Sequence, residues 1–476
     1  MKDFIKKNLP KKSQSLSEWY NRVVMLAELA DYGPARGTMI FRPYGYAIWE
    51  TVQKYMDEKI KASGVENAYF PLFIPESLLA KEKDHIKGFA PELAVVTIGG
   101  GEELKERLVV RPTSETIMYQ AYANWIKSWR DLPVLVNQWN NVVRWEKRTY
   151  LFLRTLEFLW QEGHCAHATW EESWERVLWG IKLYEQTYRE IFALPTVVGR
   201  KSESEKFAGG VATLTCEVLM PEGKALQGCT SHDLGQNFSR AQNIKFQDKD
   251  RSAKYVWQNS WGFTTRSIGG MLMAHGDDAG AVLPPRAAPV QVVIILAKSE
   301  TDVTEYAKKV ELELVQLGLR VKLDDREEES MGYKINKWEL RGVPLRIEIG
   351  IKEVRSQNLT IVRRDNQTRL LISNNNLGTV KTLLDTIQSD MLARQERFLA
   401  ENTFEAITYN RFSEIMKTTK GFIKAFWCER AECEMTIKEE TKASTRCLPL
   451  DAPKENGVCV KCGEPAIHRW LFAQAY

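Results

Sequence analysis

Long apolar runs are scarce in this chain of 476 residues. The longest aliphatic run, Val292–Ala297, is far too short to cross a bilayer, which needs about 20 apolar residues in a helix. The first ten residues are charged and lack the apolar segment of a secretory signal. Internal repeats and low-complexity segments are also missing. We therefore expect a folded, multidomain protein of the cytoplasm, with no membrane partner.

A large excess of one charge is absent too, because 66 basic residues nearly cancel 62 acidic ones and leave a formal charge of +4. The basic residues gather locally, however. Between Arg341 and Arg369 seven basic residues face only three acidic ones. Such a segment suits a polyanion, and an ordinary solvated surface explains it equally well.

Cysteines are few, and half of them are clustered near the end of the chain. Of the eight, Cys428 and Cys433 form a C-x4-C pair, Cys459 and Cys462 form a C-x2-C pair further along, and the others show no pattern. This spacing favours a metal site over disulfides, with inert or redox-active thiols as the alternative. Four thiolates would make a closed, structural zinc site in a tail whose core is too thin to fold alone.

The first part of the chain mixes strands and helices without a regular repeat. Helical spacing of apolar residues from Gly45 to Gly64 precedes a strand at 68–74, and further strands are predicted at 134–145 and 149–158. An amphipathic helix is predicted at 171–192. Residues 1–285 therefore predict an α+β domain with an antiparallel sheet, which ends at the proline-rich joint 283–289.

The pattern of predicted secondary structure changes after this joint. Strands at 291–297, 319–323 and 343–350 alternate with helices at 300–317 and 330–341, the second capped by Ser330 and stopped by Gly342. This alternation predicts a parallel-type sheet, and hence an α/β domain over 286–400. A helix at about 377–398 leads into 401–476, which we expect to be a small α+β domain built on the cysteines.

The segment with the most potentially functional side chains extends from Arg154 to His164 and reads RTLEFLWQEGH. An arginine can fork onto a phosphate, Phe158 can stack on a purine, and Trp160 with Glu162 can line a small pocket. The alternative is a buried amphipathic hairpin with solvated charged ends. The run resembles motif 2 of class II aminoacyl-tRNA synthetases, in the form found in the prolyl-tRNA synthetases.

The resemblance extends over nearly the whole chain. The helix from Gly45 and the strand containing Pro71 resemble motif 1, which supplies the dimer interface in this class and implies a homodimer. The run Ser260–Gly269, with Arg266, resembles motif 3. The stretch between Arg154 and Arg266 is too short to hold a large editing insertion. The resemblance thus implies a class II synthetase fold, an anticodon-binding domain, and the archaeal and eukaryotic-like type with a zinc-binding C-terminal domain.

This resemblance implies the activity of a proline–tRNA ligase, which uses ATP to form prolyl-adenylate and then charges the 3′ end of tRNA(Pro). Arg154 and Arg266 match the catalytic arginines, and Glu217 matches a residue that helps to hold Mg²⁺. The implied ATP contacts are Arg154, Phe158, Gln227, Thr230 and Arg266.

The implied proline site combines an anionic, a cationic and an aromatic part. Thr113 and Glu115 match residues that meet the amine, and Arg144 matches the clamp on the carboxylate. The ring-binding wall would be made by Phe89, Trp160, Glu162, Phe207 and His232. For His232 a purely structural role is the alternative.

Three implied features lie outside the catalytic core. Glu339, Arg346 and Lys352 match residues that read anticodon bases, although solvated surface charges would look the same. The terminal Tyr476 matches a tyrosine that reaches toward the active site, and packing on its own domain is the alternative. Without an editing domain, hydrolysis of mischarged tRNA would fall to a separate protein.

Two rival interpretations remain at this stage. A catalytically dead paralogue is disfavoured because both arginines and the substrate clamp are present. A threonyl enzyme is disfavoured because it needs a cysteine and histidines to bind zinc in its active site, and the matching positions here are aromatic.

Overall fold

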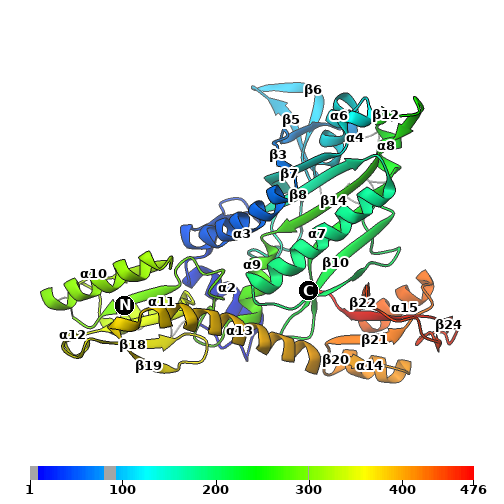
Figure 1. Ribbon diagram of the computed structural model, residues 1–476. Helices are drawn as coiled ribbons and strands as arrows, with labels where there is room; N and C mark the ends of the chain where they lie inside the picture. Colours follow the sequence, from blue (N-terminus) through cyan, green and yellow to red (C-terminus); the bar gives the residue numbers. More distant parts are fainter. Residues whose placement is uncertain (1–8, 80–92, 299) are drawn as a thin grey trace.

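A computed structural model describes residues 9–79, 93–298 and 300–476 (Figure 1). Among these residues, no helix is both long enough and apolar enough to cross a membrane. Figure 1 shows a large sheet with helices beside it, a smaller sheet with its own helices, and the long helix α13 (Gly378–Glu401) running from the smaller sheet toward the C-terminal tail.

The large sheet has eleven strands within the described part of the chain. In spatial order they are β20 (Thr403–Glu405), β21 (Phe422–Phe426), β25 (Arg469–Gln474), β22 (Ala443–Pro449), β9 (Val197–Arg200), β10 (Ala212–Leu219), β11 (Ala225–Gly235), β14 (Trp257–Thr264), β8 (Glu157–His167), β7 (Val134–Val143) and β3 (Glu66–Asn67). All neighbours from β21 to β7 are antiparallel. The edge pairs β20–β21 and β3–β7 are parallel. The predicted antiparallel sheet is confirmed.

One face of this sheet is covered by α7 (Trp170–Glu190). A capping box between Thr169 and Glu172 fixes the start of the helix. Its apolar side packs into a core shared with α2 (Leu16–Leu26), α3 (Pro43–Ala62) and α9 (Arg266–His275). Alternate residues of each strand enter this core, so the residues between them face the other side of the sheet.

Smaller elements surround the sheet. They are the pairs β1 (Ala30–Tyr32) with β2 (Met39–Phe41) and β12 (Lys245–Gln247) with β13 (Ala253–Tyr255), the sheet of β4 (Phe73–Pro75), β6 (Glu102–Val110) and β5 (Ala94–Gly99), and the helices α4 (Glu76–Leu79), α6 (Glu115–Trp125), η2 (Trp129–Asp131) and α8 (Asn237–Ala241).

Two strand predictions in this part were inaccurate. The strand expected at 68–74 is divided, because β3 ends at Asn67 and β4 begins at Phe73. The strand expected at 149–158 is a turn: Tyr150 and Arg154 exchange backbone hydrogen bonds of 2.6 and 2.9 Å around Phe152, whose φ is +61°. β8 begins only at Glu157, so motif 2 is a hairpin of β7 and β8 with a long, looped connection.

The second domain has a five-stranded sheet in the order β16 (Val321–Asp324), β15 (Val292–Leu296), β17 (Leu345–Ile349), β18 (Asn358–Arg363) and β19 (Arg369–Ser373). The first three strands are parallel, as predicted, and the last two add an antiparallel hairpin. The other elements are α10 (Thr301–Gln316), α11 (Met331–Leu340), α12 (Ile351–Ser356) and η3 (Asn374–Asn376). Ser330 caps α11 as expected, and Gly342 follows it with a φ of +75°.

The C-terminal tail carries β20, α14 (Tyr409–Lys417), β21, α15 (Ala431–Thr441), β22, the pair β23 (Gly457–Val458) and β24 (Pro465–Ala466), and β25. It has an apolar core of its own. Its sheet nevertheless continues that of the catalytic domain, because β22 pairs with β9 through Leu448 and Arg200. A backbone hydrogen bond of 3.1 Å from Leu450 to Val198 extends the pairing. The tail is therefore joined directly to the catalytic sheet.

Candidate active site

A pocket of about 500 Å³ opens on the sheet face opposite α7. Side-chain direction alternates along β11: the Ser231 hydroxyl donates to Val177 of α7, whereas Thr230 and His232 line the pocket. Twelve of the residues predicted from the sequence line it together: Thr113, Glu115, Arg144, Arg154, Phe158, Trp160, Glu162, Phe207, Gln227, Thr230, His232 and Arg266. Residues far apart in the chain thus meet in one cavity.

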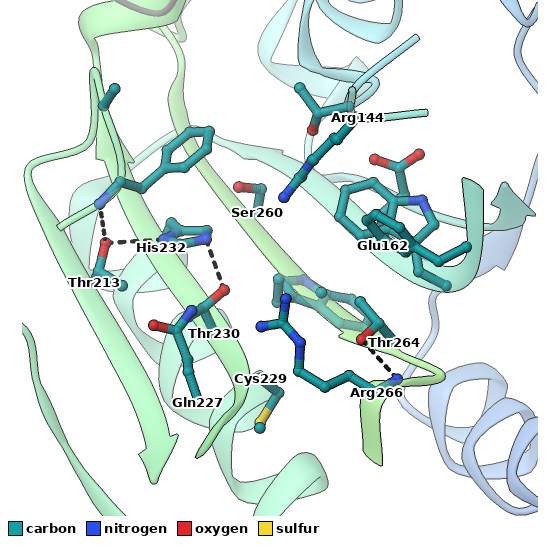
Figure 2. Close-up of a pocket in the computed structure, with 18 of the residues that line it drawn as sticks. Arg144, Glu162, Thr213, Gln227, Cys229, Thr230, His232, Ser260, Thr264 and Arg266 are labelled. Carbon is teal, nitrogen blue, oxygen red and sulfur yellow. Dashed lines mark hydrogen bonds between the residues drawn. The ribbon is translucent and has the colours of Figure 1, made fainter. Parts of the chain in front are cut away.

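Three arginines give this pocket a positive region. In Figure 2 the side chains of Arg144 and Arg266 extend toward a common space. The Arg266 Nε donates to the Leu153 carbonyl at 3.0 Å, and the Arg144 Nε donates to the Pro112 carbonyl at 3.1 Å. Burial, and then the charges of Arg144 and Arg154, lower the pKa of Arg266. Such mutual repulsion is relieved by an anionic ligand, so the region suits a polyphosphate or a carboxylate.

Arg154 is held loosely by comparison. Its side chain is 51% exposed, and its Nε lies 3.4 Å from Glu146 Oε1. The turn centred on Phe152 places Arg154 at the mouth of the pocket. A half-exposed arginine whose ion pair with Glu146 is at 3.4 Å can turn to a phosphate at little cost in stability.

Aromatic rings form a second part of the pocket. Phe158 and Trp160, two residues apart on β8, pack edge to face with ring centroids 6.0 Å apart. The Arg144 guanidinium lies over both, 5.4 and 5.6 Å from the ring centroids. These cation–π contacts fix the guanidinium between a flat surface suited to a purine and the smaller space beside Trp160.

Glu162 anchors a buried polar cluster at the inner end of the pocket. Its carboxylate accepts hydrogen bonds from Gln138 at 3.1 Å, Asn140 at 2.7 Å and His164 Nε2 at 2.9 Å, and also from the Ser114 hydroxyl. Burial alone would raise the pKa of Glu162, but these hydrogen bonds and the His164 charge hold the pKa below its ordinary value. Glu162 is therefore an anion inside the pocket.

His164 was given no role of its own from the sequence, although it ends the motif 2 run. Burial alone would lower its pKa, but Glu115 and Glu162 raise the pKa above the ordinary value. Two carboxylates around a single imidazole leave this corner with a net negative charge. An ammonium group would neutralise it, which fits a substrate amine. Only the three-dimensional proximity of Glu115 reveals this balance.

Glu115, Glu162 and His164 are also close enough to one another to hold a metal, with one possible ligand atom from each within 4.8 Å. The trio contains no cysteine, so it is not the ligand set of a threonyl enzyme. Both ring nitrogens of His164 already have protein partners: Nε2 contacts Glu162 at 2.9 Å and Nδ1 lies 3.3 Å from the Tyr119 hydroxyl.

His232 is held by two hydroxyl groups and also lines the pocket. Its Nδ1 lies 2.9 Å from the Thr213 hydroxyl and its Nε2 lies 3.0 Å from the Thr230 hydroxyl. The Phe207 ring covers it at a centroid distance of 4.5 Å. The imidazole is structurally satisfied and still forms a wall of the pocket, as Figure 2 shows.

Glu217 is a correction to the sequence prediction. A β-bulge separates it from Cys216, and it lies outside the pocket lining, fully buried. Lys201 Nζ binds one oxygen at 2.9 Å, and Arg446 of the C-terminal tail binds the other at 2.8 and 2.7 Å. With both oxygens committed to cations, Glu217 does not fit an Mg²⁺ ligand. Arg446 lies far away along the chain, so no local pattern could have indicated this partner.

The remaining predicted residues for substrate and tRNA binding are Phe89 and the three anticodon candidates. Phe89 falls outside the described residues. In the second domain Glu339 and Arg346 line one small cavity together with Arg364, and Arg346 also pairs with Glu348 at 2.9 Å. Lys352 is exposed on α12, outside that cavity. The structure therefore brings two of the three predicted anticodon residues together.

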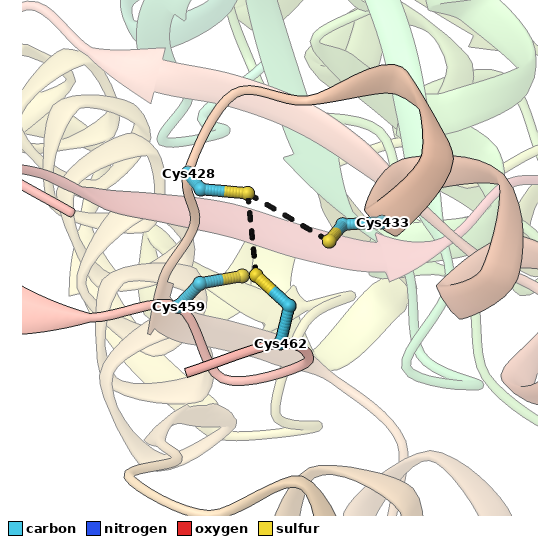
Figure 3. A group of neighbouring side chains, drawn as sticks. All are labelled: Cys428, Cys433, Cys459 and Cys462. Atoms are coloured by element: carbon cyan, nitrogen blue, oxygen red, sulfur yellow. Dashed lines mark hydrogen bonds between the residues drawn. The ribbon is translucent and has the colours of Figure 1, made fainter. Parts of the chain in front are cut away.

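The four clustered cysteines converge in the tail (Figure 3). All four sulfur atoms lie within 4.8 Å of one another, and Cys428 Sγ is 3.7 Å from both Cys433 Sγ and Cys462 Sγ. A tetrahedral Zn²⁺ with Zn–S bonds of about 2.3 Å requires S–S separations of about 3.8 Å. Disulfides need about 2.05 Å. The residues present fit a tetrathiolate metal site.

The chain end packs on the catalytic domain. The Tyr476 amide donates to the Ala225 carbonyl at 3.0 Å, and the Tyr476 ring lies 5.4 Å from Lys224 Nζ. Ala225 is two residues before Gln227, which lines the pocket. The alternative that the tail packs only on its own domain is wrong, although Tyr476 itself is not among the pocket-lining residues.

Comparison with known families agrees with this architecture. Residues 96–275 match the tRNA synthetase class II core domain (G, H, P, S and T), residues 291–382 match the anticodon binding domain, and residues 409–476 match the prolyl-tRNA synthetase C-terminal domain. The fold and the pocket therefore define a class II aminoacyl-tRNA synthetase, a class that uses ATP and Mg²⁺.

Individual relatives narrow the assignment. The chain is 48% identical to a proline–tRNA ligase of Natranaerobius thermophilus, covering 100% of this chain and 99% of the relative, and 49% identical to one of Rubrobacter xylanophilus, covering 98% of each. A crystal structure of prolyl-tRNA synthetase from Cryptosporidium parvum, complexed with halofuginone and AMPPNP, superposes with a TM-score of 0.94 at 40% identity, covering 98% of this chain and 96% of that one. The chain belongs to the proline–tRNA ligase family.

Proposed function

We infer that this chain is a proline–tRNA ligase that activates L-proline with ATP in the pocket around Glu162 and transfers it to tRNA(Pro). The observation that carries this inference is the division of a single cavity into a three-arginine region and a buried anionic corner, separated by aromatic rings. Proline carries both an ammonium and a carboxylate, and ATP supplies the polyanion. Each charge finds a complementary part of the pocket.

The arginines act on the nucleotide. Arg154 and Arg266 would contact the phosphates, while Phe158 would stack on adenine and Gln227 and Thr230 would contact the nucleotide from β11. Attack of the proline carboxylate on the α-phosphate breaks the bond to pyrophosphate and gives prolyl-adenylate. Cations that absorb the developing charge, together with in-line positioning, provide the catalysis, and no covalent protein intermediate is needed.

The amino acid would lie against β8 and β11. Thr113 and Glu115 meet the amine, Arg144 holds the carboxylate, and Trp160, Phe207 and His232 surround the ring, with Glu162 as the buried anion behind them. Mg²⁺ is usually bound largely through substrate phosphates, so it is expected to enter with ATP. The 3′-terminal ribose of tRNA(Pro) would then attack the adenylate, with Glu339, Arg346 and Lys352 contacting the anticodon.

We further propose the archaeal and eukaryotic-like type of the family. Between motif 2 and motif 3, the described residues form only α7, β9 to β11, α8, β12 and β13, which supports the absence of an editing insertion. A motif 1 dimer, a cytoplasmic location and a separate trans-editing protein belong to the same proposal. A pocket sized for proline rejects the smaller alanine by only about 1 to 3 kcal/mol. The chain should therefore form some alanyl-tRNA. Because it would lack an editing domain, incubation with preformed alanyl-tRNA should show no enzyme-dependent deacylation.

Structural zinc is the proposed occupant of the four-cysteine site. Four thiolates would close its coordination shell and hold the loops around Cys428 and Cys459 together, with no open position for chemistry. Elemental analysis should find one zinc per chain, and Cys462→Ser should lower that content. A folded, active, metal-free preparation would leave the thiols as packing groups only.

ATP–pyrophosphate exchange tests the proposed function. Exchange should depend on proline, with threonine giving far less at equal concentration. Exchange with threonine alone would establish the threonyl alternative, and no exchange with any amino acid would establish a dead paralogue.

A further inference from the structure

The C-terminal tail forms hydrogen bonds with a segment of the catalytic domain that leads into the pocket wall. Residues 204–208 line the cavity, and Phe207 within them covers the His232 ring. Residues 201–203 connect this segment to β9, the strand that pairs with β22 of the tail. Contacts that hold this connection in place therefore also hold the pocket wall that contains Phe207.

The first residues of the segment turn around Ser202. The backbone amides of Glu205 and Lys206 both donate to the Ser202 carbonyl, at 3.2 and 2.9 Å. The Phe207 amide then donates to the Thr213 hydroxyl at 2.9 Å, and the same hydroxyl contacts His232 Nδ1. A shift of Ser202 would therefore be transmitted to Phe207 through a short, hydrogen-bonded turn.

Ser202 is held from the tail by Glu434 on α15. The Ser202 hydroxyl donates to Glu434 Oε1 at 2.8 Å, and the hydroxyls of Ser204 and Thr445 also donate to this carboxylate. Glu434 is only 5% exposed, so these hydroxyls replace water as hydrogen-bond donors to its carboxylate. Next to this contact, the Lys201–Glu217–Arg446 ion pairs fix the preceding residue.

We propose that Glu434 is a positioning residue for the proline pocket: through Ser202 and Ser204 it holds the 204–208 segment, and with it the Phe207–His232 wall, in the geometry that binds the amino acid. Glu434 follows Cys433 directly, so the four-cysteine site and the pocket wall are linked through one turn of α15. This inference rests on the proposed function, because it assigns the same pocket to proline.

Three substitutions on α15 separate this role from general packing. Glu434→Met keeps a similar side-chain length but removes both acceptors, whereas Glu434→Gln keeps one acceptor oxygen and should restore much of the effect. Glu432→Met is the matched control, since Glu432 is exposed and lies on the other side of Cys433. Ser202→Ala removes the opposite end of the contact without touching the tail.

Proline-dependent ATP–pyrophosphate exchange provides the readout, with zinc content measured on each preparation. We expect Glu434→Met and Ser202→Ala each to raise the KM for proline at least fivefold while the KM for ATP changes less than twofold. The effects of the two substitutions should be less than additive in the double variant, because both remove the hydrogen bond between Ser202 and Glu434. Glu432→Met should match the unmodified chain, and zinc content should be equal in all variants.

Hydrogen exchange gives an independent view of the same segment. Amides of 203–208 should exchange faster in Glu434→Met, with α7 unchanged. An unaltered proline KM in both Glu434→Met and Ser202→Ala, or equal rises in the KM for proline and ATP, would overturn the proposal. If Glu434→Met does not fold, Ser202→Ala alone decides it. Absence of proline-dependent exchange in the unmodified chain would instead contradict the proposed function.

Discussion

Glu162 and Glu217 lie on the same sheet, with β11 and β14 between their strands. The sequence predicts both in the active site, yet their surroundings differ. Glu162 on β8 is bound by neutral donors and one imidazole and faces the pocket. Glu217 on β10 is bound by two cations, one of them from the C-terminal tail, and lies outside it. Glu162 and Glu115 together exceed the charge of the one imidazole and leave negative charge for a ligand, whereas Glu217 is neutralised within the protein.

This difference separates a binding site from a structural junction. A binding pocket must keep an incomplete balance of charge, because its ligand completes it. A domain junction must be balanced before any ligand arrives, since unpaired buried charge is costly. Burial alone therefore says little about function: both glutamates are nearly inaccessible, at 1% and 0%.

Breaking the junction should have the largest effect. We expect Glu217→Gln to lower the free energy of unfolding by about 3 to 5 kcal/mol, because Lys201 and Arg446 would remain buried without their counter-charge. Thermal unfolding measures this. The pKa of Glu217 is held below 4.5 by Arg446 and Lys201 against the effect of burial. The stabilisation should therefore be present above pH 4.5 and fade as the pH falls through that lowered pKa.

Glu222→Gln is the matched control for the junction, because Glu222 follows the same strand but is 43% exposed and lies 3.5 Å from Lys224. It should change stability little. Equal effects of the two substitutions would show that the junction pairs do not stabilise the fold.

Removing one arginine from the positive region of the pocket should strongly reduce activity without destabilising the fold. Arg154→Ala is expected to slow adenylate formation by roughly 10²- to 10³-fold or more, since the lost charge acts mainly on the transition state. The melting temperature should stay the same because Arg154 is half exposed. Pyrophosphate exchange together with a melting curve measures both. Near-normal exchange would remove Arg154 from the mechanism.

Removing the His164 imidazole tests the charge balance of the pocket carboxylates. His164→Asn should destabilise the protein by about 1 to 3 kcal/mol, by leaving Glu162 and Glu115 without their cation. The raised pKa of His164 means that its contribution is complete below pH 6.5 and is lost as the pH rises through that pKa. The lowered pKa of Glu162 means that its contribution is present above pH 4.5.

The melting-temperature difference between the unmodified chain and His164→Asn should thus be largest between pH 4.5 and 6.5 and should shrink in alkaline buffer. A difference that grows with rising pH would show that His164 is neutral in the folded protein.

The smallest expected effect comes from the chain end. Deleting Tyr476 should lower proline activation a few-fold, or by about 1 kcal/mol, because its docking at Ala225 helps to join the tail to the strand that carries Gln227. Zinc content and dimerisation should not change. Exchange kinetics identical to those of the full chain would leave the tail with a packing role only.

Local patterns predicted most of this molecule. The helix that became α7, and the strands and helices between residues 291 and 350, were evident from periodicity and caps, and the motif 2 run indicated the pocket. What escaped depended mainly on distant contacts. Two contacts join segments that are far apart in the chain: the pairing of β9 with β22, and the hydrogen bond between Ser202 and Glu434. The bulge at Glu217 is set by the register of β10 against β11. The turn at Phe152 escaped because aromatic and aliphatic residues there mimic a strand.

A crossed titration by ATP–pyrophosphate exchange tests the comparison most directly, with proline varied for Glu162→Gln and Mg²⁺ varied for Glu217→Gln. The pocket role of Glu162 predicts a KM for proline raised at least tenfold in the first variant. The junction role of Glu217 predicts an unchanged half-saturating Mg²⁺ concentration in the second. An unchanged proline KM for Glu162→Gln, or a raised Mg²⁺ requirement for Glu217→Gln, would contradict the account.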